Sequence, residues 1–173
     1  MLKTSISFFV IVLSFSLQAQ ITTTRMNEFN INDPLSKIEK ILGKKLNLKA
    51  DSYNWINYAE VDYKGIPMKL GFVRDTLVEG DVEEYRLYEI RTTSSDIKTL
   101  SGVGVGNSLE ELWDTYKRDF NISLWFGLDE LSGEVDRNNR IFELSGLEDL
   151  TVIWFFSKNG IVTEVVLSYY EGC

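Results

Sequence analysis

Residue types that commonly carry out catalysis are scarce in this sequence. It contains no histidine, and its one cysteine is Cys173. Serine–histidine and cysteine–histidine nucleophile pairs are therefore excluded, as are zinc sites that need histidine or several thiolates. We expect no catalytic residue of these kinds, no metal site and no cofactor. The single cysteine is either a free thiol or a link to another chain.

Adjacent carboxylates remain as candidates for acid–base chemistry. They occur at Glu83-Glu84, Glu110-Glu111 and Asp129-Glu130. Neighbours on a strand point to opposite faces, and on a helix they lie about 100° apart, so none of these pairs is arranged as a catalytic dyad. Glu110 and Glu111 have a sufficient structural role at a helix N-terminus.

A glycine-rich segment, Gly102-Val-Gly104-Val-Gly106, precedes a predicted helix and raises the question of a phosphate cradle. Its spacing is not that of a dinucleotide-binding loop, and the two glutamates in the first helical turn would repel phosphate. A flexible turn into the helix is the favoured interpretation.

Large aromatic side chains are the remaining candidates for recognition. Trp55 and the pair Trp125-Phe126 fall in predicted helix-to-strand loops, where exposed aromatics often anchor a partner. The alternative is that they cap the core. Trp113 and Trp154 fall at positions predicted to face the core. The sequence therefore nominates Trp55, Trp125 and Phe126 as partner-binding residues.

The charge of the chain limits its partners. Acidic residues number 26 and basic residues 18, which gives a net charge of −8. This field would repel nucleic acids and anionic membrane surfaces, so neither is expected as a partner. A protein or peptide partner, a basic one in particular, stays open beside the simpler explanation that the charge keeps the protein soluble.

Two helices must position these residues. The first is predicted to begin with Asp33 as N-cap and Pro34 at the first helical position, and to end at Gly43. The second has Ser108 and Glu111 at the spacing of a capping box. Its apolar face is predicted to hold Leu109, Leu112, Trp113 and Tyr116.

Three strand-like segments follow each helix, at 58–63, 66–73 and 85–92 and then at 140–144, 150–156 and 161–170. Alternation marks them, with Ile66, Met68, Leu70 and Phe72 on one face and, in the last strand, Ile161, Thr163, Val165, Leu167 and Tyr169. Two-residue turns at Lys64-Gly65 and Asn159-Gly160 join neighbouring strands.

The two series are related by a shift of 74 residues, which carries Leu35 onto Leu109, Ile38 onto Leu112 and Leu42 onto Tyr116. The predicted fold is therefore α+β, with two helix-plus-antiparallel-meander repeats that form a continuous or paired antiparallel sheet. The predicted boundaries are an N-terminal arm at 20–32, a first repeat at 33–100 and a second at 101–173.

This arrangement resembles the tandem-repeat architecture of the β-lactamase inhibitory protein and the outer-membrane-assembly lipoproteins of the BamE/SmpA type. The helix starts at 33–43 and 104–116, the second led by glycines, carry the resemblance together with the strands after each. The disulfides of the inhibitor and the acylated cysteine of the lipoproteins have no counterpart here. Inhibition of a β-lactamase is therefore not carried over.

The N-terminal residues have the three-part pattern of an export signal, with Lys3 before an apolar segment from Ile6 to Leu17 and Ala19 at the cleavage position. The apolar segment has about 12 residues against the roughly 20 that a membrane span needs. We expect residues 1–19 to be a cleaved signal peptide, no membrane span, and a periplasmic or secreted protein.

These observations favour an exported, non-enzymatic protein-binding or inhibitory module whose sheet faces its partner. The alternative is a cell-envelope assembly or structural protein. An enzyme that uses carboxylates alone is the third interpretation.

Overall fold

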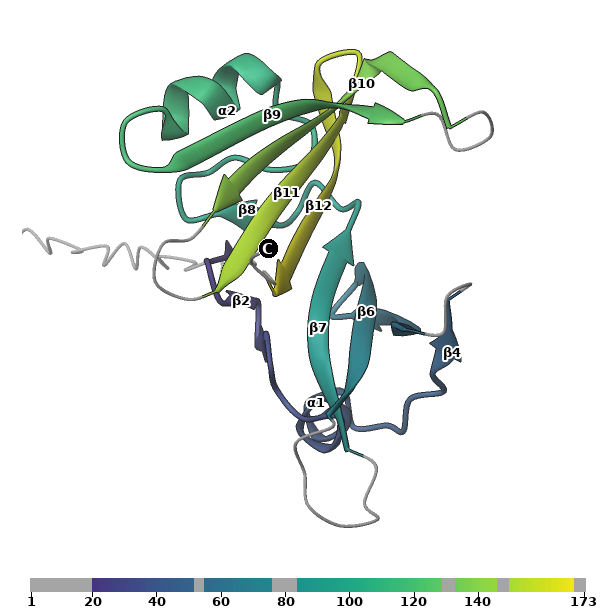
Figure 1. Cartoon of the computed structure of the whole chain (residues 1–173). Coiled ribbons are helices and arrows are strands. Elements are labelled where there is room, and N and C mark those ends of the chain that lie inside the picture. Colours follow the sequence, from purple (N-terminus) through teal and green to yellow (C-terminus); the bar gives the residue numbers. More distant parts are fainter. Residues whose placement is uncertain (1–19, 52–54, 76–83, 129–132, 146–149, 170–173) are drawn as a thin grey trace, which may run out of the picture.

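The computed structural model describes residues 20–51, 55–75, 84–128, 133–145 and 150–169. Within these residues, eight strands form one antiparallel sheet (Figure 1). Its order from edge to edge is β4 (Lys49–Ala50), β5 (Asn57–Tyr63), β6 (Ile66–Asp75), β7 (Glu84–Thr92), β12 (Ile161–Tyr169), β11 (Thr151–Lys158), β10 (Val135–Ser145) and β9 (Asn121–Leu128). The chain is thus mainly β, and the predicted antiparallel sheet is continuous.

A small mixed sheet lies beside the large one. Its order is β3 (Phe29–Asn30), β2 (Arg25–Met26), β1 (Gln20–Ile21) and β8 (Lys98–Thr99). β1 pairs antiparallel with β2 and parallel with β8. The predicted N-terminal arm is therefore part of the fold, and it places buried Ile21, Met26 and Phe29 in the core.

Helix α1 (Leu35–Leu42) ends as predicted, at Gly43 with φ 66°. Its start differs from the prediction, because Pro34 is extended, with ψ 148°, and takes the N-cap position itself. Asp33 does not cap the helix. Its carboxylate accepts hydrogen bonds from the backbone N–H of Asn30 at 3.3 Å and from Lys37 Nζ at 2.8 Å.

Helix α2 (Leu109–Tyr116) begins with the predicted capping box. The Ser108 hydroxyl accepts from the Glu111 N–H at 3.2 Å, and the Glu111 carboxylate accepts from the Ser108 N–H at 2.7 Å. These two bonds satisfy donors that a helix N-terminus otherwise leaves free. Trp113, predicted to face the core, is 49% exposed. An eight-residue helix buries only a narrow stripe, here Leu112 and Tyr116.

Both helices pack on the same face of the large sheet. Ile38 of α1 and Leu112 of α2 belong to one hydrophobic core with the inward-facing strand residues. Directly paired residues share a face, and one such row across the sheet is Ala59, Leu70, Ile90, Leu167, Ile153, Leu144 and Ile122. We call the opposite face, which no described helix covers, the open face.

Register shifts interrupt the alternation in three strands: β7, β12, and β10, where the shift lies between Asp136 and Arg140 opposite Gly127 and Phe126 of β9. In β7, Gly71 pairs with Glu89 and Phe72 with Leu87, so Tyr88 is the extra residue. In β12, Glu164 pairs with Phe156 and Val162 pairs with Ser157, so Thr163 is the extra residue. The predicted alternation of the last strand is therefore wrong at its start: Val162 is buried at 1% exposure, and Ile161 is 45% exposed.

The segment before each helix pairs with the last strand of the meander that follows it. The N–H of Asn32 donates to the Leu87 carbonyl at 2.7 Å, and the N–H of Leu87 donates to the Asp33 carbonyl at 2.9 Å. The same two bonds occur before α2. The N–H of Gly106 donates to the Val162 carbonyl at 2.9 Å, and the N–H of Val162 donates to the Asn107 carbonyl at 2.9 Å. Asn32 and Gly106 have φ of 72° and 91°, the left-handed region that favours asparagine and glycine.

The helices of the described ranges are too short to cross a membrane. The predicted signal peptide, Cys173, Glu83 and the Asp129-Glu130 pair lie outside the described residues.

Candidate functional site

The two edges of the large sheet differ in length and in charge. β4 has two residues, one of them Lys49, whereas β9 has eight residues and no charged side chain. Natural proteins protect a sheet edge by keeping the strand short or by placing lysine on it. β4 follows this pattern. β9 does not, and among the described strands no further one pairs with its outer edge.

Apolar side chains on β9 are exposed on both sides of the sheet. Leu124, Trp125, Phe126 and Leu128 are exposed at 45%, 41%, 44% and 62%, respectively. Val135, which pairs with Leu128 from β10, is 59% exposed. Scattered exposed apolar residues are ordinary, whereas these lie together along one edge strand, which makes that edge a candidate interaction site.

Trp125 and Phe126 lie in this strand, and the prediction that they lie in a loop is wrong. Trp125 pairs with Ile141 on the open face, and Phe126 pairs with Arg140 on the helix side. The guanidinium carbon of Arg140 lies 4.4 Å from the centre of the Phe126 ring, which is within cation–π range. The two nominated aromatics thus present their rings on opposite faces of one strand.

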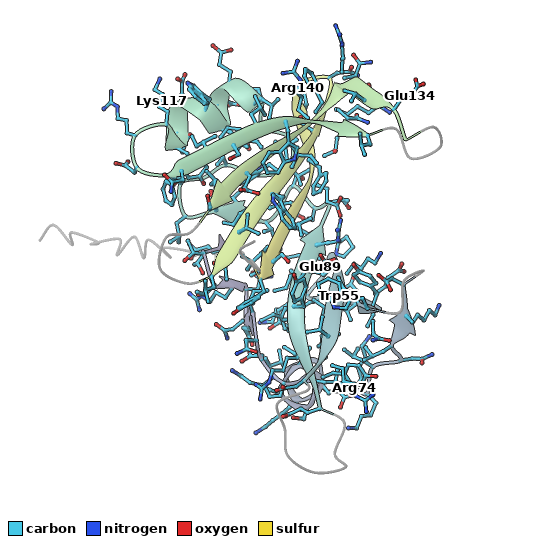
Figure 2. All side chains as sticks on the ribbon, viewed as in Figure 1. Trp55, Arg74, Glu89, Lys117, Glu134 and Arg140 are labelled. Atoms are coloured by element: carbon cyan, nitrogen blue, oxygen red, sulfur yellow. The ribbon has the colours of Figure 1, made fainter. Side chains whose placement is uncertain are left out.

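Trp55 lies in the other half of the sheet. It lies two residues before the start of β5, and its ring meets Tyr88 of β7 edge-on with the ring centres 4.9 Å apart. Five strands separate β5 from β9 in the sheet order, and Figure 2 shows Trp55 near Glu89, far from Arg140. Trp125 and Phe126 therefore lie on the same edge strand, and Trp55 lies elsewhere in the sheet.

A buried carboxylate lies next to β9 on the open face. Glu143 of β10 is 7% exposed and pairs directly with Ser123 of β9. Its Oε2 accepts a hydrogen bond from the indole Nε1 of Trp154 at 2.6 Å. Trp154 is therefore on the open face and not in the helix-side core that the sequence predicted. Among the described residues, no lysine or arginine forms an ion pair with Glu143.

A charged cluster occupies the middle of the open face. Arg91 Nε lies 2.6 Å from the carboxylate of the buried Glu89, and its Nη1 lies 3.4 Å from Glu164. Burial, followed by the charge of Glu89 and a hydrogen bond with it, raises the pKa of Tyr58 well above 10.0. The cluster is internally paired, so it is a structural link between the two halves of the sheet.

Gly71 makes room for this cluster. A Cβ at that position would lie 2.7 Å from Glu89 Cγ, 2.9 Å from Ile56 Cγ2 and 2.9 Å from Tyr58 Cε1. Only glycine allows these side chains to pack across β6 at such a distance.

Two open clefts meet at Glu164. One, of about 480 Å³, includes Glu60, Lys69 and Arg91 in its wall, and the other, of about 560 Å³, includes Arg140 and Lys158. Both contain charges of both signs. No described group of three or more acidic, histidine or cysteine side chains is arranged to hold a metal ion.

Sequence reasoning missed Glu143 and the flanking apolar residues of β9. The uninterrupted apolar segment from Leu124 to Phe126 was the available signal, because an edge strand exposed on both faces has no reason to alternate. No signal in the sequence pairs Glu143 with Trp154. Comparison of the chain with protein-family models, with curated proteins and with solved structures found no match.

Proposed function

We propose that this protein is an exported, non-enzymatic binding module that takes up an extended segment of a partner protein as an additional strand beside β9. The observation that carries the proposal is the state of that edge. β9 is an eight-residue strand with no charge, and four of its apolar side chains are exposed. Strand addition gives affinity through main-chain hydrogen bonds and specificity through alternate side chains.

The partner segment is apolar at alternate positions on both faces. On the open face its side chains meet Trp125, and on the helix side they meet Leu124 and Phe126. Aromatic residues are the commonest anchors of protein interfaces because they bury much area for little loss of side-chain freedom. Trp55 is not part of this contact and is assigned no role in it.

The partner segment also carries a cation on the open face. The partner residue that pairs with Ser123 would be separated from Glu143 only by β9, where the intervening side chain is the small one of Ser123. A lysine or arginine there extends over Ser123 towards the Glu143 carboxylate. The net charge of −8 favours the approach of such a basic segment.

We infer in addition that the two halves arose by duplication of one helix-plus-meander unit. The support comes from backbone detail as well as element order: the bulges at Tyr88 and Thr163 are 75 residues apart, and the left-handed residues Asn32 and Gly106 are 74 apart. Isolated bridges join Pro34 to Arg86 and Ser108 to Ile161, again with matching offsets.

Two matched tryptophan variants test the proposed function. The protein is immobilised and used to capture proteins from an envelope extract, and the captured amount is compared for wild type, Trp125→Lys and Trp113→Lys. Both tryptophans are about equally exposed, at 41% and 49%, but only Trp125 is on the edge strand. We expect Trp125→Lys to reduce capture about tenfold or more, since an anchoring aromatic contributes about 2 kcal/mol or more. Equal capture by the two variants would contradict the proposal.

A further inference from the structure

A small cavity, separate from β9, lies where the end of α2 meets β1, β8 and the start of β11. Its volume is about 80 Å³. Its lining residues are Ile21, Thr23, Thr99, Leu100, Ser101, Tyr116, Phe120, Leu144, Thr151, Val152 and Ile153. The apolar inner wall belongs to the core, because Ile21, Leu144 and Ile153 are each at most 6% exposed.

One hydroxyl in the wall of this cavity has no hydrogen-bond partner among the described residues. Thr151 is 3% exposed, and its Oγ1 is buried and unpaired. The neighbouring hydroxyls are paired, since Tyr116 Oη donates to Thr99 Oγ1 at 2.7 Å. Buried polar atoms are almost always hydrogen-bonded in native proteins, and an exception calls for a missing partner such as a water or a ligand. The cavity is thus arranged to receive one polar atom next to Thr151.

The rest of the lining defines the chemistry of the occupant. Among the described lining residues none is charged, so this part of the wall offers no counterion to an ionic head group. At the mouth, Leu100 is 67% exposed and Phe120 is 39% exposed, so the entrance is apolar as well. An engineered cavity of about 150 Å³ holds benzene, and a volume about half as large suits a branched group of three to five non-hydrogen atoms.

We propose that this cavity binds a neutral aliphatic ligand that carries one hydrogen-bonding oxygen. The oxygen pairs with Thr151 Oγ1, and the branched alkyl group packs against Leu144 and Ile153. A larger ligand of this class extends past Leu100 and Phe120 into solvent. This proposal does not depend on strand addition at β9, because none of the lining residues belongs to that strand.

Binding of 2-methylpropan-1-ol tests the proposal, with xenon as an apolar probe that has no oxygen. Methyl resonances of Leu144, Val152 and Ile153 report on occupancy in titrations of the whole purified protein. Thr151→Val removes the hydroxyl at nearly constant shape, and Thr151→Ser retains it.

We expect saturable shifts confined to these methyl groups. Thr151→Val should weaken alcohol binding about tenfold and leave xenon binding unchanged, and Thr151→Ser should bind the alcohol within about threefold of wild type. The proposal is wrong if the shifts do not saturate, if Thr151→Val binds the alcohol as tightly as wild type, or if a water molecule stays beside Thr151 at saturating alcohol.

Discussion

The indole of Trp154 and the carboxylate of Glu143 form a hydrogen bond of 2.6 Å on the open face, one strand in from β9. A buried carboxylate is stable only when it is well paired. Here the described chain supplies a neutral donor and no cation. Because the strand next to Glu143 is the edge strand β9, we propose that a partner strand brings a positive charge to it.

The first prediction concerns this charge. Glu143→Gln keeps the shape of the side chain and an acceptor for Trp154 but removes the negative charge. We expect capture of the envelope partner by wild type to fall steeply between low and high salt, because the contact between Glu143 and the partner cation is electrostatic. Capture by Glu143→Gln should be weaker at low salt and nearly independent of salt. Parallel salt curves for the two proteins would show that no partner cation meets Glu143.

The second prediction concerns the cap of α2. Ser108→Ala removes one member of the capping box and should lower the free energy of unfolding by about 1 kcal/mol. Ser36→Ala, at an exposed position inside α1, is the matched control and should change stability by only a few tenths of a kcal/mol. Urea denaturation measures the free energy of unfolding of the two variants. An equal decrease in both would mean that the capping box is not formed in solution.

The third prediction concerns acid. The N–H of Ser108 and, second, its hydroxyl lower the pKa of Glu111 below its ordinary value of 4.5. The stabilisation from the ionised form is therefore complete well above pH 4.5 and is lost as the pH falls through the lowered pKa. Glu111→Gln should be less stable than wild type at pH 7, and this difference should shrink at pH 3. Glu110→Gln, which keeps the capping box, should show a smaller difference at pH 7. A Glu111→Gln difference that is constant from pH 7 to 3 would contradict the assignment.

The fourth prediction concerns Gly71. Gly71→Ala places a methyl group against the side chains of Glu89, Ile56 and Tyr58, and should destabilise the protein by about 1–3 kcal/mol through overpacking. The φ of Gly71 is not in the left-handed region, so backbone strain does not contribute. Thermal unfolding measures the loss. An unchanged midpoint would mean that the charged cluster on the open face is looser than described.

Local patterns in the sequence were sufficient for much of the sheet. The alternation of Ile66, Met68, Leu70 and Phe72 predicted one buried face, and all four residues are buried. The Asn159-Gly160 turn joins β11 to β12 as expected, with both residues at positive φ. These features depend on neighbours in sequence, which is why a periodic pattern detects them.

Features that depend on distant residues could not be read from the same patterns. Tyr88 and Thr163 each add a residue to a strand, and a bulge shifts the alternation without any mark in composition. The pairing of β7 with β12 at the middle of the sheet joins residues more than 70 positions apart. Trp113 lay at helical spacing from Leu109, but only the packing of α2 decides how wide its buried stripe is.

The candidate site was predicted in part. Trp125 and Phe126 were nominated because they lie outside any periodic pattern, and the reason for that irregularity is that both faces of β9 are solvent-exposed. A short apolar segment with no alternation was interpreted as a loop. Trp55 was nominated because it lies in a predicted helix-to-strand loop, but its ring contacts Tyr88 of the central strand β7 and not β9.

Amide hydrogen exchange of the protein with its captured partner tests strand addition at β9 most directly. If the partner adds a strand, alternate amides in residues 121–128 gain hydrogen bonds, and their exchange should slow about tenfold or more, while α2 and β4 exchange at the rate of the free protein. If β9 exchanges equally fast with and without the bound partner, and protection appears on other strands or nowhere, the partner does not extend the sheet at β9 and the proposed function is wrong.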